Sequence, residues 1–183
     1  FIMKSPLFTP ENAAMLLIDH QVGTMGWVGS ASLDAIKMNT LALARAADAI
    51  DMPLILTSSM EDQAQGPLFE ELQQAVPEAY ANRILRGGVV DSMKDEGFAK
   101  AVKDSGRKNL IIAGITTDVC VVYPAITAVS QGYNVQVIVD GSGSPTQIAD
   151  ETALRRMENN GVTLTTTNQL IAELAQDWST DNG

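Results

Sequence analysis

The stretch NLIIAGITTDVCVVY, residues 109–123, contains an apolar run that breaks at Gly114 and resumes in a helical pattern. An apolar run of strand length, followed by a small-residue turn and by Thr116 and Thr117 as candidate N-caps, predicts a strand that leads directly into a helix. Cys120, the one cysteine of the chain, falls near the first turn of this predicted helix. A helix N-terminus stabilises a thiolate, so the junction offers a candidate nucleophile, although a free cysteine is more often a packed core residue.

Other apolar runs of strand length recur along the chain, with helical patterns between them. The runs cover residues 13–18, 53–56, 110–115, 135–139 and 162–167, and the helical patterns cover residues 32–49, 67–76, 96–105, 121–131 and 147–159. This alternation favours a parallel sheet that is covered on both faces. We therefore predict an α/β fold, a three-layer α/β/α doubly wound sheet that is mostly parallel and has a Rossmann-like strand order.

Length and composition favour one soluble domain. The 183 residues suffice for a full core, and we expect a single domain over residues 1–183, with residues 1–7 as an N-terminal extension and residues 178–183 as a tail. One cysteine excludes an internal disulfide, and no N-terminal stretch resembles a signal peptide, so we expect a cytoplasmic protein. The net charge of −10 and the absence of a long apolar run argue against nucleic-acid and membrane partners.

Polar side chains follow several predicted strands at the point where each strand ends. They are Asp19, residues 57–59, Cys120 and Asp140. In doubly wound sheets, ligands bind beyond the carboxyl ends of the strands, near the point where the strand order reverses. We therefore expect these groups to meet on one rim, with Asp19 as the general base toward the Cys120 thiol, although an aspartate after a strand is equally common as a cap.

The other candidate site residues are basic, aromatic or amide side chains. A buried carboxylate beside a thiolate needs a cation, and Arg83 and Arg86 compete for that place, although most arginines are solvated.

His20 is an alternative base. Neighbouring strand residues point to opposite faces, so His20 and Asp19 cannot both face Cys120 from a regular strand, which favours a structural His20. Candidate substrate-binding residues are Gln21, Trp27, Ile115 and Tyr123.

Three parts of the sequence together resemble the isochorismatase-like cysteine hydrolases, a family that includes nicotinamidases and N-carbamoylsarcosine amidohydrolases. They are LLIDHQ at residues 16–21, a basic residue ahead of Gly87-Gly88, and GITTDVC at residues 114–120. The segments DHQ and PLILTSS, the latter at residues 53–59, are most similar to the YcaC-like branch. The resemblance extends over roughly residues 8 to 177 and implies a hydrolase that is a homo-oligomer, as members of the family commonly are.

The resemblance implies a catalytic triad of Asp19, a basic residue and Cys120. Lysine is usual at the basic position. Arg86 is the better match in this chain, because it keeps the spacing to Cys120 without a gap and Arg83 does not. An arginine cannot lose its proton, so all proton transfer falls on Asp19 or on water.

The resemblance also implies an oxyanion hole. The family has a cis peptide bond in the turn ahead of the cysteine, here between Ile115 and Thr116. This bond would direct the Thr116 N–H toward the same point as the Cys120 N–H, where the two groups stabilise a tetrahedral intermediate.

The chain departs from the nicotinamidases in its metal-ligating residues. Those enzymes carry a metal site built from histidines and an aspartate after the second strand, but residues 57–63 contain no histidine, and His20 is the only one in the chain. We therefore expect no metal and no other cofactor. Residues 141–145, GSGSP, lack the spacing and the lysine of a phosphate loop and predict a flexible rim turn.

The sequence is compatible with three functions. The first is a cysteine hydrolase that cleaves a small amide, carbamoyl or related acyl substrate through a thioester on Cys120. The second is a binding or assembly protein of the same fold with reduced catalysis, which the arginine in place of lysine favours. The third is isochorismatase-type cleavage of a vinyl ether, and Cys120 counts against it because members with that activity lack the cysteine. The conformations of loops 25–31, 61–66 and 81–91 decide the substrate.

Overall fold

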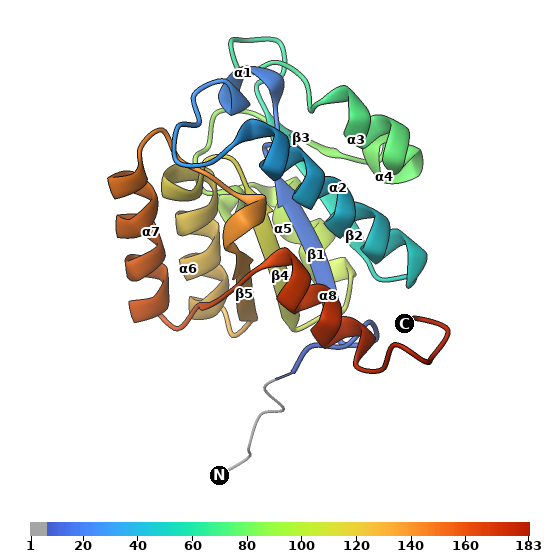
Figure 1. Ribbon diagram of the computed structural model, residues 1–183. Coiled ribbons are helices and arrows are strands. Elements are labelled where there is room, and N and C mark those ends of the chain that lie inside the picture. Colours follow the sequence, from blue (N-terminus) through green and yellow to red (C-terminus); the bar gives the residue numbers. More distant parts are fainter. Residues whose placement is uncertain (1–6) are drawn as a thin grey trace.

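A six-stranded parallel sheet forms the centre of the computed structural model, which describes residues 7–183 (Figure 1). Its strand order is β3-β2-β1-β4-β5-β6, and every neighbouring pair is parallel. The strands are β1 (Ala13–Ile18), β2 (Leu54–Ser59), β3 (Ile84–Arg86), β4 (Asn109–Gly114), β5 (Asn134–Ile138) and β6 (Thr163–Thr165). The strand order reverses between β1 and β4, which makes this pair the switch point of a doubly wound sheet. The predicted α/β/α fold is confirmed.

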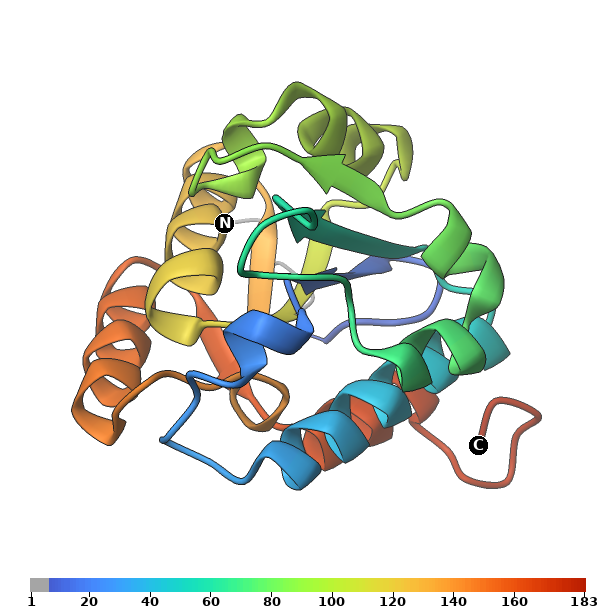
Figure 2. The same ribbon diagram turned by 90° about the horizontal axis from the view of Figure 1, so that it is seen from above.

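Helices cover both faces of the sheet, and the alternation of side chains along the strands explains how. In β1, Met15 and Leu17 pack into one hydrophobic layer, whereas Leu16 and Ile18 pack into the other. All six residues of β1 are buried, as expected for a strand covered on both faces. The first layer contains α2 (Leu33–Ala49), α3 (Glu70–Ala75) and α8 (Thr167–Ala175), and the second contains α5 (Glu96–Asp104), α6 (Val122–Ser130) and α7 (Gln147–Asn159) (Figure 2).

Several element boundaries differ from the sequence-based expectation. The helix predicted over 67–76 is shorter, α3 alone, and a second short helix that was not predicted, α4 (Pro77–Ala81), begins directly after it, because Pro77 favours the start of a helix and cannot continue one. The strand predicted over 162–167 stops at Thr165, and α8 begins at Thr167. The three-residue strand β3 lies in a segment expected to be a loop.

Short elements at the carboxyl ends of the strands complete the architecture. They are α1 (Val22–Met25), the 3₁₀ turns η1 (Ser92–Lys94) and η3 (Val139–Gly141), and the π-helical turn η2 (Thr117–Val121). In Figure 1, α1 lies at the upper edge of the sheet, directly after β1. Of the predicted N-terminal extension, residues 1–6 lie outside the described residues. No helix formed by residues 7–183 is long and apolar enough to cross a membrane.

Gly114 allows β1 and β4 to approach closely where both strands end. A Cβ atom added at Gly114 would lie 2.4 Å from the Ile18 carbonyl oxygen and 3.0 Å from a Val121 side-chain carbon. The first of these contacts is to backbone, which cannot rotate away. The residues that follow β1 and β4 are therefore held next to each other by a position that accepts only glycine.

We predict that Gly114→Ala lowers the free energy of unfolding by about 1 to 3 kcal/mol, because overpacking shifts the backbone. Denaturant unfolding at fixed protein concentration measures this change. Gly87→Ala is the matched control, since a Cβ atom at Gly87 meets nothing within 4 Å. Equal stability of the two variants would show that the sheet tolerates a side chain at Gly114.

Candidate active site

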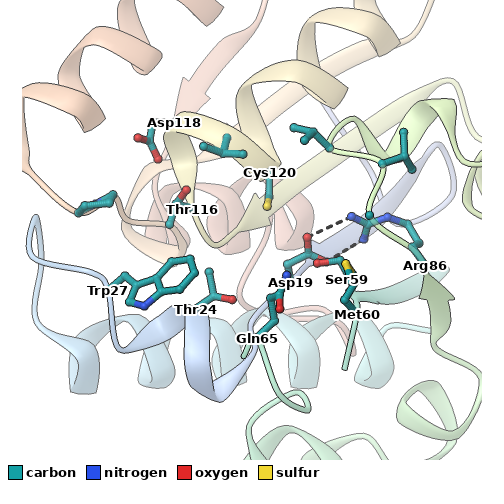
Figure 3. Close-up of a pocket in the computed structure, with 15 residues that line it drawn as sticks. Asp19, Thr24, Trp27, Ser59, Met60, Gln65, Arg86, Thr116, Asp118 and Cys120 are labelled. Atoms are coloured by element: carbon teal, nitrogen blue, oxygen red, sulfur yellow. Dashed lines mark hydrogen bonds and ion pairs between the residues drawn. The ribbon is translucent and has the colours of Figure 1, made fainter. Parts of the chain in front are cut away.

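A buried ion pair between Asp19 and Arg86 lies at the carboxyl ends of β1 and β3 (Figure 3). The Arg86 Nη1 donates to Asp19 Oδ1 at 2.7 Å, and Nη2 donates to Oδ2 at 3.1 Å. Nη1 also donates to the Thr57 hydroxyl at 3.0 Å, and that hydroxyl donates to the Ile84 carbonyl at 2.7 Å. Each ionised side chain is 1% exposed. Three neighbouring strands therefore fix both charges in a bidentate geometry.

The backbone turns sharply at Asp19, where φ is +59°. Aspartate tolerates this left-handed conformation better than most residues. The turn is secured on both sides, because the Asp19 N–H donates to the Thr57 carbonyl at 3.0 Å and the Asp19 carbonyl accepts from the Gln21 N–H at 2.7 Å. The regular alternation of β1 ends here, and the carboxylate faces the pocket above the sheet.

Cys120 lies in η2, the π-helical turn between β4 and α6. Its sulfur points toward Asp19 (Figure 3). Thr116 occupies the N-cap position, as predicted, but its side chain makes no capping hydrogen bond. The peptide bond between Ile115 and Thr116 is cis, as the family resemblance implied.

The environment of Cys120 raises the pKa of the thiol. Burial is the largest cause, followed by the negative charge of Asp19 and a hydrogen bond to it. The Thr116 backbone N–H and the positive charge of Arg86 act in the opposite direction and are weaker. The expectation of a thiolate stabilised at rest by a helix end is therefore wrong, because burial and the neighbouring carboxylate keep the thiol protonated.

A pocket of about 260 Å³ opens in front of Cys120 and the ion pair (Figure 3). It lies over the ends of β1, β2, β3 and β4, at the switch point of the sheet. Apolar side chains supply much of its wall. The lining residues are Asp19, Thr24, Trp27, Ser59, Met60, Gln65, Arg86, Gly88, Val89, Val90, Thr116, Asp118, Val119, Cys120 and Pro145.

Of the four predicted substrate-binding residues, only Trp27 lines this pocket. Gln21 is fully buried and ties two loops together, since its amide group donates to the Ser59 and Gly66 carbonyls and accepts from the Ser59 N–H. Ile115 is fully buried in the hydrophobic layer that contains α2. These two placements correct the expectation, because both side chains point into the protein.

Tyr123 and Asp140 also lie away from the pocket lining. Tyr123 is on α6 and stacks with Arg156 of α7, whose guanidinium carbon lies 5.4 Å from the ring centroid. The Asp140 carboxylate accepts hydrogen bonds from the N–H and the hydroxyl of Thr167, both at 2.8 Å. Asp140 therefore holds the first residue of α8. Of the four polar groups predicted to meet on one rim, three contribute to the pocket lining, through Asp19, Ser59 and Cys120.

His20 is fully buried and faces away from Cys120. Its Nε2 lies 2.9 Å from the Gly141 carbonyl oxygen, and its ring packs edge-on against Phe69 with a centroid distance of 6.5 Å. Burial lowers the pKa of His20 to about 4, so the ring is neutral at pH 7. His20 does not line the pocket, and the structural role favoured from the sequence agrees with this placement.

Arg83 does not reach Asp19. Its Nε donates to Glu61 Oε1 at 2.8 Å, and its Nη2 donates to Oε2 at 3.1 Å. The Ser58 hydroxyl donates to the same carboxylate at 2.7 Å, and Arg83 also stacks on Tyr80. Of the two competing arginines, the structure therefore brings Arg86 to Asp19, and Arg83 stabilises the loop after β2.

Hydrogen bonds to neighbouring segments hold residues 141–145 in place, which corrects the expectation of a flexible turn. Gly143 accepts a hydrogen bond from the Thr117 N–H at 2.9 Å, and the Ser142 hydroxyl accepts one from the Gly114 N–H at 3.0 Å. The Ser144 hydroxyl donates to Asp150 at 2.8 Å. These bonds fix the wall of the pocket beside η2.

Sequence reasoning missed most of the pocket wall, including Asp118. Asp118 precedes Cys120 by only two residues. This short spacing could have placed Asp118 in the same turn as Cys120 and hence near the pocket. Its Oδ1 atom is buried and has no hydrogen-bond partner. Across residues 7–183, no group of three or more His, Cys, Asp or Glu side chains is placed to hold a metal ion.

Comparison with known proteins extends the resemblance seen in the sequence. A family model described as "Isochorismatase domain" matches residues 13–169. The probable hydrolase YcaC of Escherichia coli strain K12 is 40% identical over 171 residues, which cover 93% of this chain and 81% of that protein.

Two solved structures are similar over nearly the whole chain. YcaC from Pseudomonas aeruginosa, solved with hexane-2,5-diol and covalent acrylamide, has a TM-score of 0.93 and 39% identity, with 97% of this chain and 87% of that one covered. The crystal structure of the E. coli YcaC gene product, described as an octameric hydrolase of unknown specificity, has a TM-score of 0.92 and 39% identity, with coverages of 97% and 86%.

The buried His20 predicts a loss of stability in acid. Its folded pKa of about 4 lies below the ordinary value of 6.5, so the unfolded state binds a proton more readily between these values. Stability therefore falls as the pH drops from 7 to 5, by about 2 kcal/mol from this group. Urea unfolding at both pH values measures the loss. In His20→Gln the loss should shrink by that amount, and an unchanged loss would contradict a buried neutral His20.

The raised thiol pKa predicts how Cys120 titrates. Because the chain has one cysteine, the thiolate absorbance near 240 nm reports Cys120 alone, with Cys120→Ser as the blank. We expect no thiolate in the wild type at the pH of about 8.5 where a free cysteine is half ionised. Asp19→Asn should move ionisation to lower pH, since Asp19 raises the thiol pKa, and Arg86→Ala should move it to higher pH.

Arg83→Ala is the matched control for this titration and should leave it unchanged, because Arg83 pairs with Glu61. A thiolate that forms near neutral pH in the wild type would contradict the described environment of Cys120. A shift in Arg83→Ala and none in Arg86→Ala would mean that the wrong arginine has been placed at Asp19.

Proposed function

The chain belongs to the isochorismatase family and is a hydrolase, and from this premise we propose that it cleaves a small amide, carbamoyl or related acyl substrate through a thioester on Cys120. One observation carries the proposal. The Cys120 thiol faces a carboxylate, Asp19, whose orientation is fixed by two hydrogen bonds from Arg86 inside a pocket large enough for a small molecule. A nucleophile, a base and a group that orients the base are the parts that covalent catalysis requires.

In the first step, the Cys120 sulfur attacks the substrate carbonyl carbon while Asp19 takes the thiol proton. The raised thiol pKa makes this transfer part of the attack, because no thiolate is stored beforehand. The carbonyl oxygen becomes an oxyanion. The backbone N–H groups of Thr116 and Cys120 are its proposed donors, and the Thr116 N–H already favours negative charge on the sulfur.

In the second step, the tetrahedral intermediate collapses and the carbon–nitrogen bond breaks. Asp19 returns its proton to the leaving nitrogen, so the amine departs neutral and a thioester remains on Cys120. A water molecule then loses a proton to Asp19 and attacks the thioester carbonyl. The carbon–sulfur bond breaks, the acid product leaves, and the proton on Asp19 returns to the sulfur.

Arg86 acts in this scheme as a fixed cation. It stays protonated at every accessible pH and therefore cannot supply or remove a proton. Its two terminal guanidinium nitrogens donate hydrogen bonds to both carboxylate oxygens of Asp19 and limit the rotation of that carboxylate. An arginine at this position is thus compatible with turnover, which weakens the case for a protein that only binds or assembles.

The relatives support a reactive group and an oligomer. The P. aeruginosa YcaC structure carries covalent acrylamide, an unsaturated amide that alkylates thiols, and the E. coli relative is described as octameric. We infer that this chain likewise forms a homo-oligomer and that Cys120 is its reactive group. Vinyl ether cleavage receives no support from the site, because it does not require a thiol facing a carboxylate.

The proposal predicts that Cys120→Ala and Cys120→Ser abolish hydrolysis of any amide that the wild type turns over. Asp19→Asn should be equally inactive while it still binds the substrate, because it keeps the shape of the side chain and loses the base. Release of ammonia or amine from a panel of small amides measures turnover, and circular dichroism confirms the fold. Near-native turnover in either Cys120 variant would rule out the thioester.

A further inference from the structure

The charges in the pocket wall do not balance. Three ionised side chains line the pocket, namely Asp19, Arg86 and Asp118. The first two neutralise each other in the bidentate pair. No hydrogen bond or ion pair within residues 7–183 reaches the Asp118 carboxylate. Asp118 therefore has no charged partner in this wall; Arg156 lines an adjacent hollow together with Asp118 but forms no ion pair with it.

The pocket offers no free cation to a negatively charged substrate. The terminal nitrogens of Arg86 are occupied by Asp19 and Thr57. Its remaining Nε is buried and unpartnered, with too little exposed surface to be reached from the pocket. A substrate carboxylate placed here would meet the charge of Asp118, and the lining of this pocket has no free cation to offset it.

Asp118 and Trp27 lie on one side of Cys120, and the Asp19–Arg86 pair lies on the other (Figure 3). A carbonyl group at the Cys120 sulfur thus places the rest of a substrate beside the indole ring and the carboxylate. An indole face attracts cations and stacks on flat apolar groups. A carboxylate accepts hydrogen bonds from ammonium, amide or ureido N–H groups.

We propose that Asp118 determines the charge selectivity of this pocket: it favours substrates whose group beyond the reacting carbonyl is neutral or cationic and carries N–H donors, and it rejects substrates with a carboxylate there. The inference rests on the proposed function, since it assigns the substrate class of the same site. Asp118 is a specificity-determining residue in this account, and the reacting atoms remain those of Cys120 and Asp19.

Charged methanethiosulfonates test the proposal without a known substrate. The trimethylammonium-ethyl and sulfonatoethyl reagents share one reacting group, and each forms a mixed disulfide on the cysteine sulfur and releases methanesulfinate. Because Cys120 is the single cysteine, the mass of the intact protein reports its modification. The ratio of cation rate to anion rate, divided by the same ratio for 2-mercaptoethanol, is independent of how much thiolate is present.

We expect this normalised ratio to be on the order of tenfold in the wild type at 0.15 M salt, where distant surface charges are screened. Asp118→Asn should lower it by about fivefold, since the local charge is removed. Asp118→Glu should retain it. Asp48→Asn is the matched control, because it makes the same charge change at an exposed position near the end of α2 that does not line the pocket.

A wild-type ratio equal to that of the free thiol overturns the proposal, as does a ratio that Asp118→Asn leaves unchanged or that Asp48→Asn lowers equally. If Asp118→Asn does not fold, Asp118→Ser replaces it in the same comparison. Failure of the proposed hydrolysis is a separate result. It would appear as turnover that survives in Cys120→Ala, with the charge ratio still as expected.

Discussion

The Asp19–Arg86 ion pair is the interaction on which the rest of the site depends. Burying two charges is costly, and the pair is stable only because its geometry and its additional hydrogen bonds offset that cost. Arg86 comes from the edge strand β3 and Asp19 from the central strand β1, with Thr57 of β2 between them. The three strands must end in register for both hydrogen bonds to form. Removing either partner would leave an uncompensated buried charge, a change that costs about 3 to 5 kcal/mol.

The same pair sets the chemistry of the thiol. Burial is the main cause of the raised pKa of Cys120; Asp19 raises this pKa further, and Arg86 lowers it. The result is a cysteine that rests protonated beside its base. In the proposed mechanism, such a thiol attacks as its proton passes to Asp19, so no thiolate needs to form before the substrate binds.

The sequence was sufficient for the parts of the molecule that depend on local pattern. Buried strands appear as apolar runs, and the residues that follow two of them, Asp19 and Cys120, meet at the switch point as predicted. The spacing also favoured Arg86 over Arg83, and the structure brings Arg86 to Asp19, while its part in catalysis stays a prediction. β3 was missed because a three-residue edge strand with a half-exposed pattern has no apolar run.

Other features depend on tertiary structure and could not be read from spacing. Gln21 follows Asp19 closely, yet the path of the loop after β2 decides that its amide binds backbone. Whether the pKa of the thiol is raised or lowered depends on how deeply Cys120 is buried and on which oxygen atoms face it. A prediction from the position of Cys120 at a helix end includes neither its burial nor the oxygen atoms that face it.

The most direct test of the account is to trap the acyl-enzyme. Wild-type protein is mixed with a small neutral amide that it hydrolyses, quenched in acid within milliseconds to seconds, and digested for mass spectrometry. The thioester mechanism predicts an acyl mass on the peptide that contains Cys120, which hydroxylamine removes and which is absent in Asp19→Asn. Steady turnover with no such adduct at any quench time, or an acyl group on a different residue, would contradict it.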